Sequence, residues 1–126
     1  MWNFIRKTDL YKTDMAFVDF NSKVKLTIWP GIVGSFHHTD SITFGHIQLD
    51  KGTPLPEHSH PHEQWTHVIK GKLKLTIEGE SQILEPGMSA YIPSDKKHSG
   101  QALTHCYVID CFSPVREDIR DMEENI

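Results

Sequence analysis

Residues 58–64 read His-Ser-His-Pro-His-Glu-Gln and place two imidazoles two positions apart, with an amide side chain four positions further on. In an extended strand, side chains two positions apart lie on the same face of the strand. His58 and His60 can therefore reach one point in space, as a metal site requires. We interpret this stretch as one half of a metal centre.

Most of the chain around this stretch has the residue pattern of β-strands. Four runs rich in β-branched and aromatic residues, most of them alternating apolar and polar side chains, are bounded by turns that contain Gly or Pro. Short strands at this spacing predict an all-β sandwich or barrel. Residues 114–126 are rich in Asp and Glu and predict a short C-terminal helix or a frayed tail. The four runs span residues 24–29, 42–49, 72–77 and 104–112.

Length and charge narrow the possible functions. The 126 residues carry a net charge of −4, and we expect one domain spanning residues 1–126. The chain has no long Lys- or Arg-rich stripe, which disfavours nucleic-acid binding. Residues 1–7 contain no apolar run long enough for a signal peptide or a membrane span, so we expect no membrane association and a cytoplasmic location. Cys106 and Cys111 fall on opposite faces of a strand, so we expect free thiols rather than a disulfide.

The spacings around the histidines form two blocks, one from Gly52 to Gly71 and one from Gly87 to Ala102. The blocks resemble the two motifs of the cupin superfamily, whose members are small jelly-roll β-barrels with a metal in the barrel mouth. In the second block, Asp95 stands where Gly is usual and Ala102 where Asn is usual, which leaves the local turn geometry open. The resemblance implies one divalent transition metal: nickel, zinc, iron or manganese. The implied ligands are His58, His60, Gln64 and His98.

Gln64 falls where most cupins place Glu, and Glu63 is a competing candidate because a carboxylate is the better metal ligand. Strand parity favours Gln64, since this side chain shares a face with His58 and His60 while Glu63 points away. His62 has the same parity, but we expect it in a loop after the Pro61 break. A neutral amide leaves the full charge of the ion uncancelled, so we expect a more electrophilic and more weakly held metal.

A second informative segment, residues 110–118, reads Asp-Cys-Phe-Ser-Pro-Val-Arg-Glu-Asp. Asp110 interrupts an apolar strand, and a buried carboxylate there needs water, a partner or a ligand. Arg116 could clamp a substrate carboxylate, or it could simply form an ion pair with Asp110. Together with residues 58–64, the segment is similar to the pectin- and alginate-degradation cupins that convert 4,5-unsaturated monouronates into linear keto sugars. That resemblance implies that Asp110, Phe112 and Arg116 act on the substrate.

The resemblance implies a metal-dependent, isomerase-type enzyme that acts on a small sugar acid. Asp110 would move protons, Arg116 would orient the carboxylate and Phe112 would pack on the sugar. Two alternatives stay open: a cupin dioxygenase, against which Gln64 argues, and a non-catalytic cupin that binds a sugar or another small ligand. The family also implies a homodimer. Three aromatic residues could supply an apolar contact or complete the core: Trp2, Phe4 and Trp29.

Overall fold

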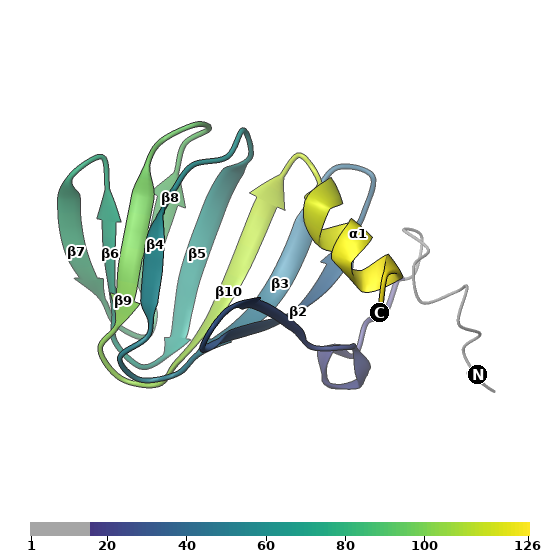
Figure 1. The fold of residues 1–126 in the computed structure, drawn as a ribbon, viewed down its shortest axis with the longest axis horizontal. Coiled ribbons are helices and arrows are strands. Elements are labelled where there is room, and N and C mark those ends of the chain that lie inside the picture. Colours follow the sequence, from purple (N-terminus) through teal and green to yellow (C-terminus); the bar gives the residue numbers. More distant parts are fainter. Residues whose placement is uncertain (1–15) are drawn as a thin grey trace.

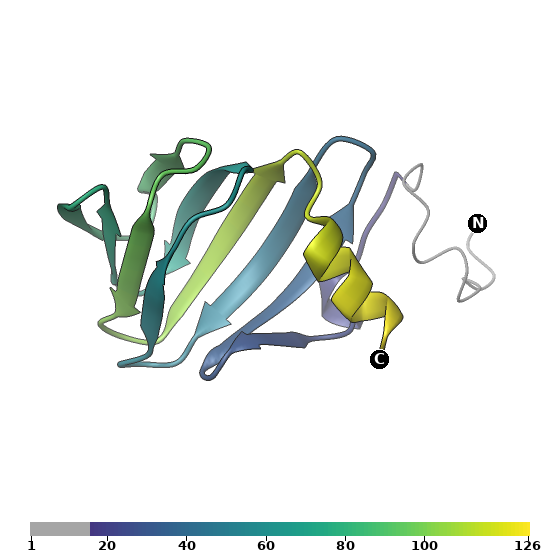
Figure 2. The same ribbon diagram turned by 45° about the horizontal axis from the view of Figure 1, so that its top comes forward.

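The computed structural model describes residues 16–126 and shows two antiparallel β-sheets that face each other (Figures 1 and 2). The six-stranded sheet has the order β1-β2-β3-β10-β5-β8, and the four-stranded sheet has the order β4-β9-β6-β7. Because the chain passes back and forth between the sheets, the arrangement is a jelly roll, and the predicted all-β fold is confirmed. The strands are β1 Leu26–Trp29, β2 Ile32–His38, β3 Thr43–Leu49, β4 Pro54–His58, β5 Glu63–Lys70, β6 Leu73–Ile77, β7 Glu80–Leu84, β8 Ser89–Ile92, β9 His98–Ala102 and β10 Cys106–Ser113.

Within residues 16–126, two short helical elements flank the strands. The 3-10 helix η2 spans Phe20–Ser22, and the α-helix α1 spans Glu117–Glu124 beside β2 and β3 (Figure 1). The predicted C-terminal helix is therefore confirmed, and its Ile119 is buried in the core. None of the helices within residues 16–126 is long and apolar enough to cross a membrane.

Residues 58–64 do not form one strand. β4 ends at His58 in the four-stranded sheet, and β5 begins at Glu63 in the six-stranded sheet. Residues 59–62 form the loop between the sheets. The assumption of one extended strand through residues 58–64 is therefore wrong, because the chain changes sheets here.

The core lies between the sheets, where alternate side chains point inward. The largest fully buried side chain is Phe36. A methyl group on Gly34 would come within 2.8 Å of the Phe36 ring and 2.6 Å of Ile47, and one on Gly45 would come within 2.7 Å of the same ring. The two glycines therefore leave the space on β2 and β3 that this ring occupies.

The structure shows where both cysteines lie, and where Trp29 lies among the three aromatic residues named above. Cys106 and Cys111 are both free thiols, the first buried and the second half-buried, as the strand parity predicted. Trp29 is half-buried and packs against the core, so it completes the core. Trp2 and Phe4 lie outside the described residues.

The packing of Phe36 against glycine makes Gly45→Ala destabilising. We expect the free energy of unfolding to fall by about 1–3 kcal/mol, because the added methyl overpacks the ring. Urea unfolding followed by circular dichroism measures the change. Placing Gly45→Ala in a Phe36→Leu background should recover part of the loss, and an equal loss in both backgrounds would contradict the steric explanation.

Candidate functional site

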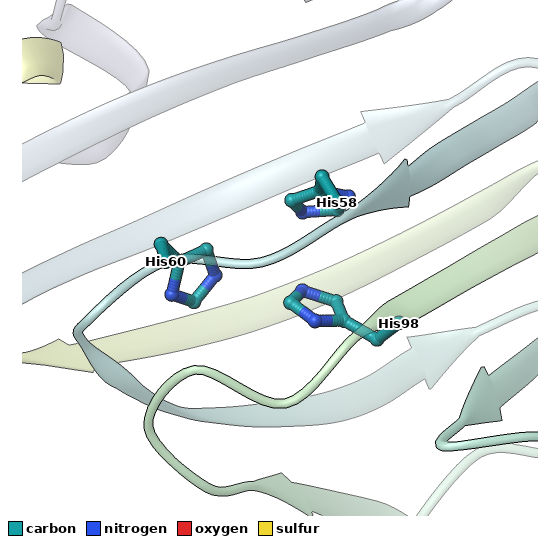
Figure 3. A group of neighbouring side chains, drawn as sticks. All are labelled: His58, His60 and His98. Atoms are coloured by element: carbon teal, nitrogen blue, oxygen red, sulfur yellow. The ribbon is translucent and has the colours of Figure 1, made fainter.

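Three histidines gather where β4 ends and β9 begins (Figure 3). His58 ends β4 and His98 begins β9, and the two are direct cross-strand partners in the four-stranded sheet. Their ring centroids are 4.1 Å apart. His60 comes from the loop after β4, and its ring lies 5.0 Å from that of His98. One nitrogen from each ring lies within 4.8 Å of the others, so the three imidazoles are able to share one metal ion.

Each of these imidazoles uses Nδ1 to contact a backbone carbonyl. The Nδ1 of His58 lies 2.7 Å from the carbonyl oxygen of Pro56. For His60 the partner is the His62 carbonyl at 2.9 Å, and for His98 it is the Lys96 carbonyl, also at 2.9 Å. Since a carbonyl only accepts, Nδ1 carries the proton in all three rings. The Nε2 lone pairs are thereby left free for a metal, the arrangement that metal-binding histidines show.

His98 carries the clearest sign of a missing partner. Its side chain is 1% exposed, and its buried Nε2 atom has no hydrogen-bond partner within residues 16–126. A buried nitrogen without a partner costs stability, and a metal ion would satisfy it. Burial lowers the pKa of His98 to about 4, and burial also lowers the pKa values of His58 and His60. All three rings are therefore neutral at pH 7, as metal ligands must be.

Gln64 turns its carbonyl oxygen toward the same point. Its Oε1 lies 3.0 Å from Nε2 of His60, while its Nε2 donates to Oγ1 of Thr66 at 2.8 Å. The Thr66 hydroxyl donates in turn to Oδ1 of Asp110 at 2.8 Å. An ionised carboxylate only accepts, so Thr66 must accept from the amide, and this fixes the orientation of Gln64. Two acceptors, Oε1 and the free Nε2 of His60, thus face each other, as they do around a cation.

Strand register brings these groups together. Gln64 pairs with Phe112, and Thr66 pairs with Asp110, on the inner face of β5 and β10. Thr66 was missed by the sequence analysis. Its position two residues after Gln64 on a predicted inward face is the signal that could have found it.

Asp110 is buried, and burial raises its pKa to about 6. The Thr66 hydrogen bond and the nearby Arg116 charge oppose this rise. Arg116 forms its ion pair with Asp118, at 3.0 and 2.8 Å, so the alternative of an Asp110–Arg116 ion pair is wrong within the described residues. The guanidinium carbon lies 4.7 Å from the centroid of the Phe112 ring.

These side chains line one pocket between the sheets, with an empty volume of about 670 Å³ including its open mouth. Most of the lining side chains are apolar, and the Trp29 ring lies 5.0 Å from that of His58. Lining residues with polar side chains are His58, Gln64, Thr66, Asp110 and Arg116.

The competing candidates lie away from this point. Glu63 is exposed on the outer face and accepts a hydrogen bond from the Tyr91 hydroxyl. His62 lies in the loop, as expected, with its ring 5.5 Å from that of His60. Asp95, at the usual glycine position, has a φ of 65°. Asp tolerates this left-handed conformation better than most residues, which explains how the turn survives the replacement.

Comparison with known proteins agrees with this geometry. Residues 45–110 match the cupin domain family. The chain belongs to the cupins. It is 32% identical over 82 residues to the pectin degradation protein KdgF of Dickeya dadantii (strain 3937), a match that covers 64% of this chain and 74% of that protein.

Two further proteins are similar to this chain, one over most of its length and one over about half of it. The structure of KdgF from Halomonas sp. superimposes on this cupin with a TM-score of 0.78 and 30% identity, covering 83% of this chain and 98% of that one. A mannose-1-phosphate guanylyltransferase of Salmonella montevideo is 39% identical over 67 residues, or 47% of this chain. The matched region spans only 14% of that protein's length.

The geometry predicts that this cupin binds a divalent ion through His98. We expect His98→Ala to weaken Zn²⁺ or Ni²⁺ binding by more than about 100-fold. Losing a ligand costs more affinity than losing a residue that only hydrogen-bonds to a ligand. Because burial lowers the pKa of His98 to about 4, this ligand stays neutral at pH values where a free imidazole, with its ordinary value of 6.5, is protonated. Calorimetric titration at about pH 7.5, where all three imidazoles are neutral, should detect binding to the wild-type protein. His105→Ala, on an exposed histidine outside the cluster, is the control, and equal affinities for the two variants would contradict the site.

The hydrogen-bond chain predicts a role for Thr66 in metal binding. Thr66→Val keeps the shape but releases the Gln64 amide, so we expect the affinity for Ni²⁺ or Zn²⁺ to fall about tenfold. Thr66→Ser keeps the hydroxyl and should keep the affinity. Titration of the apoprotein measures both variants, and an unchanged affinity in Thr66→Val would show that Gln64 is not held through Thr66.

Proposed function

We propose that this cupin opens the ring of 4,5-unsaturated monouronates, derived from pectin or alginate, and yields linear keto sugars. The observation that carries the proposal is the convergence of Asp110, Phe112 and Arg116 on one pocket beside the imidazole cluster. Similarity to the two KdgF proteins supports an enzyme of pectin degradation. The chemistry of the substrate gives each group a task.

The proposed substrate is a cyclic hemiacetal that carries an enol ether and a carboxylate. Ring opening releases an enol, which becomes a ketone when a proton moves from oxygen to carbon. The reaction therefore needs a group that accepts and returns protons, a group that fixes the carboxylate, and stabilisation of negative charge on oxygen. It needs no change of oxidation state.

Asp110 is suited to the proton transfers. A carboxyl group with a pKa of about 6 exchanges protons readily near neutral pH. Thr66 holds one of its oxygens, Oδ1, and so orients the carboxylate within the pocket. We propose that Asp110 accepts the hemiacetal hydroxyl proton and returns a proton to the enol carbon.

Arg116 and Phe112 are suited to substrate binding. The guanidinium lies over the Phe112 ring at the pocket, and Asp118 holds it through Nε and Nη2. The planar fork of Arg116 would orient the uronate carboxylate, and Phe112 would pack against the sugar. A divalent ion held by the three imidazoles and Gln64 would supply Lewis-acid stabilisation of substrate oxygens. Single-domain organisation, homodimer formation and a cytoplasmic location stay predictions.

The test is turnover of 4,5-unsaturated galacturonate or mannuronate monomer, followed by loss of the ultraviolet absorbance of the ring double bond. We expect Asp110→Asn to lower kcat by about 100-fold or more while substrate binding persists. Asp40→Asn, on an exposed carboxylate, is the matched control. If the metal-loaded wild-type protein binds the sugar but does not exceed the spontaneous rate, the protein is a binding cupin and the proposal is wrong.

The proposal also predicts a pH dependence. A base with a raised pKa of about 6 is ionised above that value and protonated below it. We therefore expect kcat/KM to fall as the pH drops through about 6, and Asp110→Asn to lose this dependence. A wild-type profile that stays flat down to about pH 4.5 would exclude Asp110 as the base.

A further inference from the structure

A chain of buried polar groups connects α1 to β2 and β3, outside the metal centre. The Arg116 backbone N–H donates to Oγ1 of Thr43 at 2.8 Å, and the same oxygen lies 2.8 Å from Nδ1 of His38. The other ring nitrogen, Nε2, lies 3.4 Å from Oε1 of Glu123. Thr43, His38 and Glu123 are all buried, with residue exposures of 0%, 7% and 5%, so solvent does not compete with the contacts.

Two hydrogen bonds and one close contact make up this chain. The Thr43 hydroxyl oxygen accepts from the Arg116 amide and also forms a hydrogen bond with Nδ1 of His38. The approach of His38 Nε2 to the Glu123 carboxylate is a contact at ion-pair distance rather than a hydrogen bond. One buried imidazole thus touches both the hydroxyl that holds the residue before α1 and a carboxylate in the last turn of α1.

The stability of α1 alone does not explain these residues. Glu123 lies in the last turn, where the helix dipole disfavours a negative charge, and burying a carboxylate is costly. Well-packed apolar side chains usually stabilise such a position at least as well as a buried charged pair. Buried polar pairs do, however, restrict how two elements fit together. Lys23 also interacts with Glu123 through its charge, so a cation lies near this carboxylate.

The helix that is held in this way forms part of the pocket wall. Arg116 immediately precedes α1, and both Arg116 and Ile119 line the pocket. Asp118 fixes the guanidinium from within the same segment, and therefore cannot set its position relative to the sheets. The contact that joins the Arg116 backbone to the six-stranded sheet is the one with Thr43.

We propose that Thr43, His38 and Glu123 are positioning residues that fix the Arg116 guanidinium over the pocket by holding both ends of α1 on β2 and β3. This inference rests on the proposed function, which gives Arg116 the substrate carboxylate to bind. This positioning role differs from a contribution to folding, because its effect on substrate binding depends on the Arg116 side chain.

The experiment measures KM and kcat on the unsaturated monouronate for Thr43→Val, with and without Arg116→Ala. We expect Thr43→Val to raise KM about tenfold, the size of one lost hydrogen bond. Zn²⁺ affinity should be unchanged, because Thr43 contacts none of the candidate ligands. In the Arg116→Ala background the same change should have little further effect. Thr43→Ser should restore the wild-type KM, because it keeps the hydroxyl.

Glu123→Ala provides a second route if Thr43→Val does not fold, because it removes the side chain that contacts His38. We expect it to raise KM, whereas Glu124→Ala, on the exposed neighbouring position of α1, should not. Hydrogen exchange at the Arg116 amide, which needs no substrate, should accelerate in Thr43→Val and in Glu123→Ala.

Two results would overturn the inference: an unchanged KM in the foldable variants, or the same rise in KM with and without Arg116. Absence of turnover in the wild-type protein would instead reject the proposed function, and hydrogen exchange at Arg116 would still show whether the contacts hold α1.

Discussion

Each imidazole of the histidine cluster donates its Nδ1 proton to a backbone carbonyl, and the direction of the three Nε2 lone pairs follows from that constraint. Backbone carbonyls are rigid parts of the fold, so the rings are oriented before any ion arrives. The cross-strand pairing of His58 with His98 supplies two of the rings, and the loop that changes sheets supplies His60. The centre is therefore built by the crossing from one sheet to the other.

On the pocket wall formed by β5 and β10, hydrogen bonds likewise orient a candidate ligand. Gln64, Thr66 and Asp110 form one hydrogen-bonded row, so the charge of Asp110 determines which end of the Gln64 amide faces the histidines. A single ionised carboxylate thus orients a neutral amide close to the histidine cluster. The same carboxylate lies in the pocket with a raised pKa, so orientation and proton transfer both depend on one residue.

The sequence predicted the fold class and the candidate residues better than it predicted the reason for their geometry. Motif spacing placed His58, His60, Gln64 and His98 together, although parity along one strand was the wrong argument because residues 59–62 are a loop. Period-two alternation still held within β5, which is why Gln64 is buried and Glu63 exposed.

Other features depend on pairing between distant segments, which a local pattern does not reveal. His38 in β2 belongs to none of the predicted strands or motifs, yet it contacts Glu123 of the C-terminal helix. Arg116 was expected either to clamp a substrate or to pair with Asp110, and its actual partner, Asp118, follows it by two positions. The path of the chain after β10 places Arg116 against Asp118 and not against Asp110.

The crossing between sheets has a consequence for the stability of the whole chain. His58 and His98 belong to the four-stranded sheet, whereas Gln64 belongs to the six-stranded sheet, and the two sheets share no strand. An ion bound by all of them would act as a cross-link between two layers that otherwise adhere through their apolar faces. An ion that binds only the folded chain at a hundredfold excess over its Kd adds about 2.7 kcal/mol to the free energy of unfolding. The lifetime of such a protein would then vary with the metal supply of its surroundings.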